Sequence, residues 1–309
     1  MTPPNLIHDT LHDSVNFTVP QGACDCHTHV FGPTTTYPLA MNRVYTPGQA
    51  SVASLLALQQ HLHLGRVVVV QPSPYAADNA CTVDALLEMG GRARGVAVID
   101  EATTDVQLQA MHDAGVRGIR LNLETGGMHD PVAATQQLRW ASERVASLGW
   151  HLQLYTNLAV LAALQGVIRS LPNPVVIDHF GGAQAASGSG QLHFDVLLQL
   201  VREGNVWVKL SAPHRISSAP DCQDAGTLVS ALVAANSDRM LWGSDWPHPG
   251  PKPGVARSPL VTEVFNQIND GRALNRLAEW VNDEVTLRKI LVDNPARLYD
   301  YDLPGLGAK

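Results

Sequence analysis

Four polar residues of the chain have side chains that suit acid–base chemistry or metal binding. His27 and His29 are separated by one residue, and His179 and Asp245 lie far downstream, each at the end of an apolar run. Imidazole and carboxylate groups can move protons near neutral pH or ligate a divalent ion. A lone His-x-His pair can equally be a buried, hydrogen-bonded pair, so what matters is whether the fold brings all four together.

The His27/His29 pair lies in an extended segment, ACDCHTHVF (23–31). Because side chains alternate along a strand, Asp25, His27 and His29 are expected to share one face. The intervening cysteines and threonine are expected on the other face, where the cysteines pack against helices as small apolar residues.

The elements that carry these residues recur along the chain as eight short β-branched runs. They span residues 23–31, 66–73, 94–99, 115–123, 150–156, 174–180, 206–211 and 240–246. An amphipathic stretch long enough for a helix separates each run from the next, which indicates parallel strands. A parallel sheet must be covered on both faces, and closure into a (β/α)8 barrel of the TIM type satisfies this without exposed edges. The main alternative, an open doubly wound sheet, lacks support because no G-x-G-x-x-G motif follows any run.

Barrel closure explains how residues distant in sequence can meet. The active sites of such barrels lie at the carboxyl ends of the strands. His29, His179 and Asp245 each lie at the end of an expected strand, and Gly/Pro-rich loops follow the last two. The sequence therefore predicts one polar cluster above the barrel axis, formed by His27, His29, His179 and Asp245.

The expected organisation is a polar lead-in over residues 1–22 followed by one barrel domain over residues 23–309. A net charge of −7 and a pI near 6.0 give no basic patch for nucleic acid or for an anionic membrane. No apolar stretch reaches the roughly 18 residues of a transmembrane helix, and the first residues lack the pattern of an export signal. Four scattered cysteines suit reduced thiols. We therefore expect a cytoplasmic protein that acts on a small molecule, with homo-oligomerisation left open.

Several motifs resemble the amidohydrolase superfamily, amidohydrolase 2 type. They are DCHTHVFGP (25–33), VIDHFG (176–181), WGSDWPHP (242–249) and NPARLYDY (294–301). The group they are similar to contains 2-pyrone-4,6-dicarboxylate lactonases, 4-sulfomuconolactone hydrolases and galactarolactone isomerases. The resemblance implies a barrel hydrolase of aromatic compound catabolism with His27, His29, His179 and Asp245 as its reacting centre.

The resemblance also implies an anion-binding wall, to which it assigns Arg120, Tyr155 and Arg215. Guanidinium groups hold a carboxylate or sulfonate in a fixed fork, and a phenol adds a neutral donor. Ser73, after the second expected strand, is a further candidate substrate donor. Arg120 ends a strand and is expected to be held more rigidly than Arg215, which lies in a loop. A buried Arg120 without an anion would also be costly.

The chain departs from the dicarboxylate lactonases just after RLNL (120–123). It reads ETGG (124–127) where those enzymes carry a further arginine, so one cationic contact is missing. This favours another small anionic lactone, monoanionic or sulfonated, unless Lys252 or Arg257 in the loop after the last strand supplies the charge.

A metal is expected to be optional. In this superfamily a mononuclear site usually takes a histidine from the end of the fifth strand, where this chain has Tyr155. His151 begins that strand, about 13 Å away at the usual rise per residue, and cannot reach the same ion. Arg120 stands where a binuclear site would need a bridging lysine, so two metals are not expected.

No cofactor is therefore obligatory. A single Zn²⁺ remains chemically reasonable, with His27, His29 and Asp245 as ligands and His179 nearby, because imidazole and carboxylate are zinc ligands.

The favoured function is hydrolysis of a small anionic lactone. Asp245 would activate water as general base, and the three histidines, at least one of them protonated, would polarise the carbonyl. The anion-binding wall would orient the acid group of the substrate. Three alternatives stay open: a lactone isomerase on the same site, a zinc-dependent amidohydrolase or decarboxylase, and a non-catalytic binding protein.

Overall fold

Eight parallel strands form the centre of the molecule. The computed structural model describes residues 12–123, 131–251 and 255–302. The strands are β1 (Cys24–Thr28), β3 (Arg66–Val70), β4 (Ala93–Ala97), β5 (Val116–Asn122), β6 (His151–Tyr155), β7 (Val175–Ile177), β8 (Val206–Ser211) and β9 (Met240–Gly243). They follow one another in the order β1-β3-β4-β5-β6-β7-β8-β9, and each neighbouring pair is parallel. The eight strands expected from the β-branched runs are confirmed.

The sheet closes on itself beyond the carboxyl end of β9. The N–H of His29 donates to the carbonyl of Trp246 (2.8 Å), and the N–H of Asp245 donates to the carbonyl of His27 (2.8 Å). Thr28 and Trp246 also form an isolated parallel bridge. The strands therefore make a nearly closed barrel, as predicted, and not an open doubly wound sheet.

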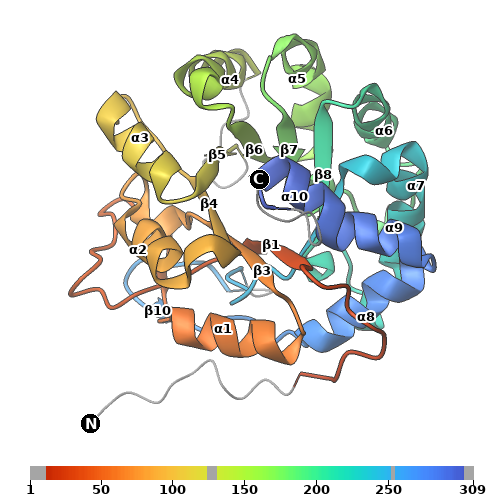
Figure 1. Ribbon diagram of the computed structural model, residues 1–309. Helices are drawn as coiled ribbons and strands as arrows, with labels where there is room; N and C mark the ends of the chain where they lie inside the picture. Colours follow the sequence, from red (N-terminus) through yellow and green to blue (C-terminus); the bar gives the residue numbers. More distant parts are fainter. Residues whose placement is uncertain (1–11, 124–130, 252–254, 303–309) are drawn as a thin grey trace.

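Helices surround the barrel as a ring, and α10 lies near the centre of that ring (Figure 1). Their bounds are α1 (Val52–His61), α2 (Ala80–Met89), α3 (Asp105–Asp113), α4 (Pro131–Val145), α5 (Leu158–Ser170), α6 (Phe194–Glu203), α7 (Gly226–Asn236), α8 (Asp270–Val281), α9 (Glu284–Arg288) and α10 (Asn294–Tyr299). Capping residues determine where several of these helices begin. Ser51 and Asn157 accept backbone N–H bonds at the starts of α1 and α5, and Thr104 opens α3 with a capping box.

Alternate strand residues face two separate apolar layers. Val67 and Val69 of β3 pack in the large layer shared with the helices, whereas Val68 and Val70 belong to a smaller cluster. Tyr301 joins this inner cluster and donates from its hydroxyl to the carbonyl of Val67 (2.7 Å). Its tyrosine ring closes the amino end of the barrel, which leaves the carboxyl end for polar chemistry.

β1 does not follow simple alternation. Its pairing register with β3 shifts in the middle of the strand, which is the mark of a bulge. Cys24 and Cys26 pack in the inner cluster, and Asp25 accepts a hydrogen bond from Gln59 of α1 (3.3 Å). The expectation that Asp25 shares a face with the two histidines while the cysteines face helices was therefore wrong. The additional residue of the bulge returns both histidines to the inner face.

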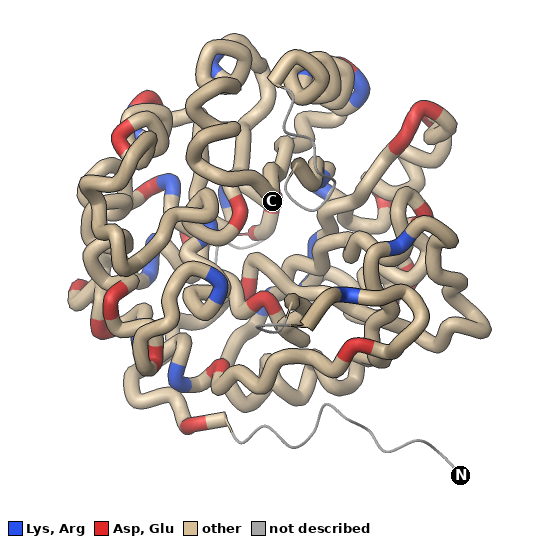
Figure 2. The backbone as a smooth tube through the Cα atoms, turned by 180° about the vertical axis from the view of Figure 1, so that it is seen from behind, with Lys and Arg blue, Asp and Glu red and all other residues tan. Residues whose placement is uncertain are grey.

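Charged residues of both signs occur along the described chain. In the view of Figure 2, lysine and arginine positions are interspersed with aspartate and glutamate positions. Within residues 12–123, 131–251 and 255–302, no helix is long and apolar enough to cross a bilayer. All four cysteines are free thiols.

Candidate active site

A cavity of about 290 Å³ opens at the carboxyl ends of the strands. Its lining comprises His29, Tyr45, Pro72, Ser73, Arg120, Asn122, Tyr155, His179, Arg215, Asp245, Pro249, Pro251 and Arg257. Every residue that the sequence assigned to substrate binding is in this lining, as are three of the four assigned to the reaction. The fourth, His27, is fully buried in contact with them.

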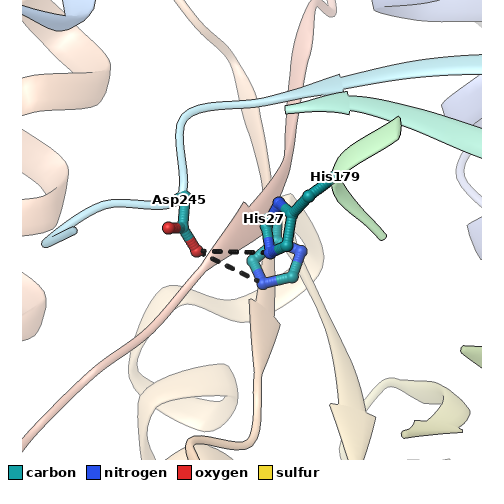
Figure 3. Close-up of side chains that lie close together, drawn as sticks. All are labelled: His27, His179 and Asp245. Carbon is teal, nitrogen blue, oxygen red and sulfur yellow. Dashed lines mark ion pairs between the residues drawn. The ribbon is translucent and has the colours of Figure 1, made fainter. Parts of the chain in front are cut away.

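Asp245 lies at the centre of the predicted cluster. Its Oδ1 is 3.6 Å from the Nε2 of both His27 and His29 and 3.8 Å from the Nε2 of His179. Figure 3 shows the rings of His27 and His179 directed at this carboxylate. In the described part of the chain, neither His27 Nε2 nor Asp245 Oδ1 has a hydrogen-bond partner. The four residues therefore meet around one carboxylate oxygen that is free to accept a proton.

The backbone fixes the position of this carboxylate. Asp245 adopts a positive φ of 70° in the turn after β9, a conformation that persists only when surrounding contacts hold it. The buried carboxylate of Asp25 supplies such contacts by accepting the N–H groups of His27 (3.2 Å) and Ser244 (2.9 Å). Asp25 thus ties β1, which carries His27, to the turn after β9 that carries Asp245.

The hydrogen bond at Nδ1 of each histidine determines whether its Nε2 carries a hydrogen or a lone pair. His29 Nδ1 lies 2.8 Å from a backbone carbonyl of β3, so it donates, and a neutral His29 presents a lone pair at Nε2. Nδ1 of His27 lies 3.3 Å from Nζ of Lys209 and 3.2 Å from Oδ1 of Asp178; with Lys209 as the donor, the hydrogen of His27 is on Nε2. The Ser211 hydroxyl, 2.8 Å from Nδ1 of His179, can impose the same arrangement there. We infer that His27 and His179 are donors into the cavity and that His29 is an acceptor.

Burial and neighbouring charges set the protonation states. Burial lowers the pKa of His27 well below its ordinary value and that of His179 to about 4. Burial alone would raise the pKa of Asp245, but Arg215 and the nearby histidines hold it well below its usual range. Neither His27 nor His179 is therefore the protonated histidine that the sequence led us to expect beside Asp245. Arg215 supplies a positive charge beside Asp245.

Arg215 is fixed to the reacting carboxylate. Its Nε (2.8 Å) and Nη2 (2.6 Å) both donate to Oδ2 of Asp245, and Nη2 also donates to the carbonyl of Pro249. Arg215 lies in a loop, as expected, and these two bonds to Asp245 hold its guanidinium in place. Arg215 lines the cavity and also turns Oδ1 of Asp245 toward the histidines.

Arg120 is paired with a residue that the sequence analysis did not single out. Its Nε donates to Oδ2 of Asp178 (3.0 Å), which also accepts from Gln153 (3.0 Å). Lys209 lies 3.6 Å from Oδ1 of Asp178 and donates to Gln153 (2.7 Å). Asp178, Gln153 and Lys209 are fully buried. Asp178 thus supplies the anion that a buried Arg120 requires, and only the position of Arg120 in the cavity wall points to a substrate.

Two of the missed residues carried a usable signal. Lys209 interrupts the apolar run VWVKLS (206–211), and Asp178 interrupts VVIDHF (175–180). A charged residue inside a strand that a parallel sheet buries on both faces needs a partner, which is a reason to look for an internal ion pair. Tyr45 lies outside the barrel strands and carried no such signal.

The donor atoms fit a single divalent cation. Ligand atoms of His27, His179 and Asp245 lie within 4.8 Å of one another, and a cation would satisfy the two unpartnered atoms among them. The sequence placed His29 in this set and His179 beside it, whereas the compact group contains His179. Binding through Nε2 would require the hydrogen of His27 to move to Nδ1, which faces Oδ1 of Asp178 at 3.2 Å.

Two other expectations bear on metal binding. His151 begins β6, and its ring packs 5.2 Å from the ring of Tyr299, away from the cavity that Tyr155 lines. A second group of potential ligands, His214, Asp245 and His248, shares the same carboxylate. The predictions about a missing cationic contact at ETGG (124–127) and a replacement by Lys252 concern positions outside the described residues.

Fold and site agree with the outcome of comparison with known proteins. The amidohydrolase family model matches residues 24–301, and the chain belongs to this family. It is 38% identical to a 2-pyrone-4,6-dicarboxylate hydrolase of Comamonas testosteroni, over 92% of each chain. It is 36% identical to a 4-sulfomuconolactone hydrolase of Rhizobium radiobacter, again over 92% of each chain.

Solved structures share the barrel. A probable 2-pyrone-4,6-dicarboxylic acid hydrolase of Acinetobacter baumannii, solved with citric acid bound, superposes with a TM-score of 0.77 at 25% identity. The match covers 91% of this chain and 100% of that one. The family resemblance expected from the four sequence motifs is therefore confirmed.

Proposed function

We propose that this protein hydrolyses the ester bond of a small anionic lactone, with Asp245 as general base. The observation that carries the proposal is the convergence of three imidazole Nε2 atoms on the unpartnered Oδ1 of Asp245, in a cavity lined by arginines. Two relatives above 35% identity that span nearly the whole chain are named as hydrolases of lactones or pyrones, which supports the same reaction class.

The attacking water would sit between two acceptors. Asp245 Oδ1 and His29 Nε2 are 3.6 Å apart, and a water that donates one hydrogen to each directs a lone pair at the substrate. As the water oxygen bonds to the carbonyl carbon, its proton passes to Asp245. Arg215 holds the carboxylate in the orientation that receives it.

The carbonyl oxygen would face the two donors. Nε2–H of His27 and of His179 would stabilise the negative charge that develops there. Collapse of the tetrahedral intermediate breaks the bond to the ring oxygen, which takes the proton back from Asp245. Arg120, Tyr155 and Ser73, all in the cavity wall, would hold the remote acid group and the ring during this sequence.

A panel of small anionic lactones tests the proposal. Hydrolysis produces a carboxylic acid that releases about one proton per turnover near neutral pH, which a pH indicator records. A lactone isomerase, which would use the same base but a substrate hydroxyl as nucleophile, releases none. Turnover without proton release would therefore assign the isomerase activity, and no turnover with any lactone would refute both.

Neither Asp245 nor His179 should produce an acid limb in the pH dependence of kcat/KM between about pH 5 and about pH 8. Asp245 acts in its ionised form, and its pKa is held well below the ordinary carboxyl range, so the base form persists throughout this window. His179, with a pKa of about 4, stays neutral over the same window. His179 should begin to limit activity near pH 4, where it takes up a proton. Initial rates in overlapping buffers measure this, and an acid limb between about pH 6 and 7 that persists in His29→Gln would contradict the assignment.

Activity should survive exhaustive chelation. In the proposed mechanism Asp245 is the base, and His27 and His179 donate hydrogen bonds to the substrate carbonyl. Arg215 supplies a fixed positive charge, so no metal is required. A Zn²⁺ held by His27, His179 and Asp245 would instead polarise the carbonyl and lower the pKa of water. Elemental analysis and kinetics before and after chelation separate the cases. Stoichiometric zinc, with activity lost on removal and regained on addition, would overturn this expectation.

A further inference from the structure

Arg257 is a third arginine of the cavity wall. Its Nε (2.7 Å) and Nη2 (2.6 Å) donate to the two oxygens of Glu263, and its guanidinium carbon lies 3.6 Å from the centre of the Tyr45 ring. Glu263 is not in the cavity lining, whereas Arg257 and Tyr45 are. The ion pair therefore fixes the guanidinium from outside the cavity and leaves Nη1 outside that pair.

Two short strands keep this wall in place. β2 (Thr46–Pro47) and β10 (Thr262–Glu263) pair in parallel and join the segment after β1 to the segment after β9. The hydroxyl of Thr46 (2.6 Å) and Nη2 of Arg43 (3.1 Å) both donate to the carbonyl of Pro259. Arg257 is thus a positioned cation and not a surface side chain that happens to reach the cavity.

Arg257 and Arg120 reach the same cavity from different segments of the chain. Arg120 belongs to β5, the fourth strand of the barrel, whereas Arg257 follows β9, the eighth, and contacts Tyr45, which follows β1. The cavity that Asp245 lines therefore holds guanidinium groups from two separate segments.

We propose that Arg257 forms a second anion subsite, so that the substrate is a small lactone with two acid groups, one held at Arg120 and one at Arg257. This inference rests on the proposed function. A guanidinium already fixed by a bidentate ion pair loses little conformational freedom on binding a carboxylate or sulfonate. Arg257 thereby supplies the cationic contact whose absence was expected from ETGG in place of an arginine-bearing turn.

The first test compares 2-pyrone-4,6-dicarboxylate with each of its two monocarboxylates. Arg257→Met should lower kcat/KM for the dicarboxylate by about tenfold or more, and should leave one of the monocarboxylates nearly unaffected. Arg257→Lys, which keeps the charge but not the fork, should lie between wild type and Arg257→Met. An equal loss for all three lactones would overturn the subsite, because it would mean that Arg257 only supports the cavity wall.

Arg43→Met is the matched control. Arg43 belongs to the same pair of segments and carries the same charge, but it is outside the cavity lining. This variant should leave the ratio of kcat/KM between dicarboxylate and monocarboxylates unchanged. A ratio shifted as far as in Arg257→Met would assign the effect to net charge or to the support of the segment, and the subsite would be refuted.

A binding measurement separates this inference from the proposed function. Titration calorimetry with citrate, used as a polycarboxylate probe, should show weaker binding to Arg257→Met than to the wild type. If citrate binding weakens but no lactone is hydrolysed, the subsite stands and the lactonase assignment fails. If lactones are hydrolysed but Arg257→Met changes neither citrate affinity nor selectivity, the lactonase stands and the subsite fails. Absence of citrate binding and of lactone turnover by the wild type would overturn both.

Discussion

Replacing Asp245 with asparagine should lower kcat by at least about 100-fold while the barrel stays folded. Oδ1 of Asp245 is the atom on which the three Nε2 atoms converge, and it is free to accept a proton. An amide oxygen at this position can still accept a hydrogen bond from Arg215, but it cannot take a proton from water. The variant should therefore bind substrate and fail at the chemical step.

Steady-state kinetics and thermal unfolding together check this prediction. Retained citrate binding in Asp245→Asn would show that the cavity is intact. Asp84→Asn is a suitable control, because it removes one exposed carboxylate that bonds only to the Tyr37 hydroxyl (2.9 Å) in the described structure. A variant that kept more than about a tenth of wild-type kcat would show that another group is the base.

The sequence predicted the fold well because its signals were local. Eight β-branched runs separated by helix-length segments permit few architectures other than a parallel barrel. The convergence of His27, His179 and Asp245 followed from the same reasoning, since each residue lies near the carboxyl end of an expected strand and the strands of such a barrel end on one face. A local pattern combined with a strong topological rule was sufficient.

The details that the sequence could not predict arise from contacts between distant segments. The bulge in β1 depends on the register with β3, so strict alternation placed Asp25 on the wrong face. The bonds of Arg215 to Asp245 depend on how a loop folds, and no periodicity encodes that. The sequence offered Arg257 only as one of two possible sources of the missing cationic contact. Its position depends on a contact with Tyr45, which belongs to a different loop.

Asp178→Asn should destabilise the protein by about 3 to 5 kcal/mol, because it leaves a buried charge without its counter-charge. Asp178 and Lys209 are both fully buried, and their charged atoms lie 3.6 Å apart. Asparagine fills nearly the same volume as aspartate, so the expected loss comes from the missing charge and not from a cavity. Chemical denaturation monitored by fluorescence measures it.

A double-mutant cycle with Lys209→Met identifies the partner. If Lys209 is the charge that Asp178 neutralises, the double variant Asp178→Asn/Lys209→Met should recover at least about half of the stability lost in Asp178→Asn, because neither buried charge then remains unpaired. Losses that simply add would mean that Arg120 is the main partner, since it also donates to Asp178 (3.0 Å). The distinction bears on function. One oxygen of Asp178 accepts a hydrogen bond from Arg120, and the other lies 3.2 Å from Nδ1 of His27. The carboxylate of Asp178 therefore links Arg120 to a histidine that we propose as a donor to the substrate carbonyl.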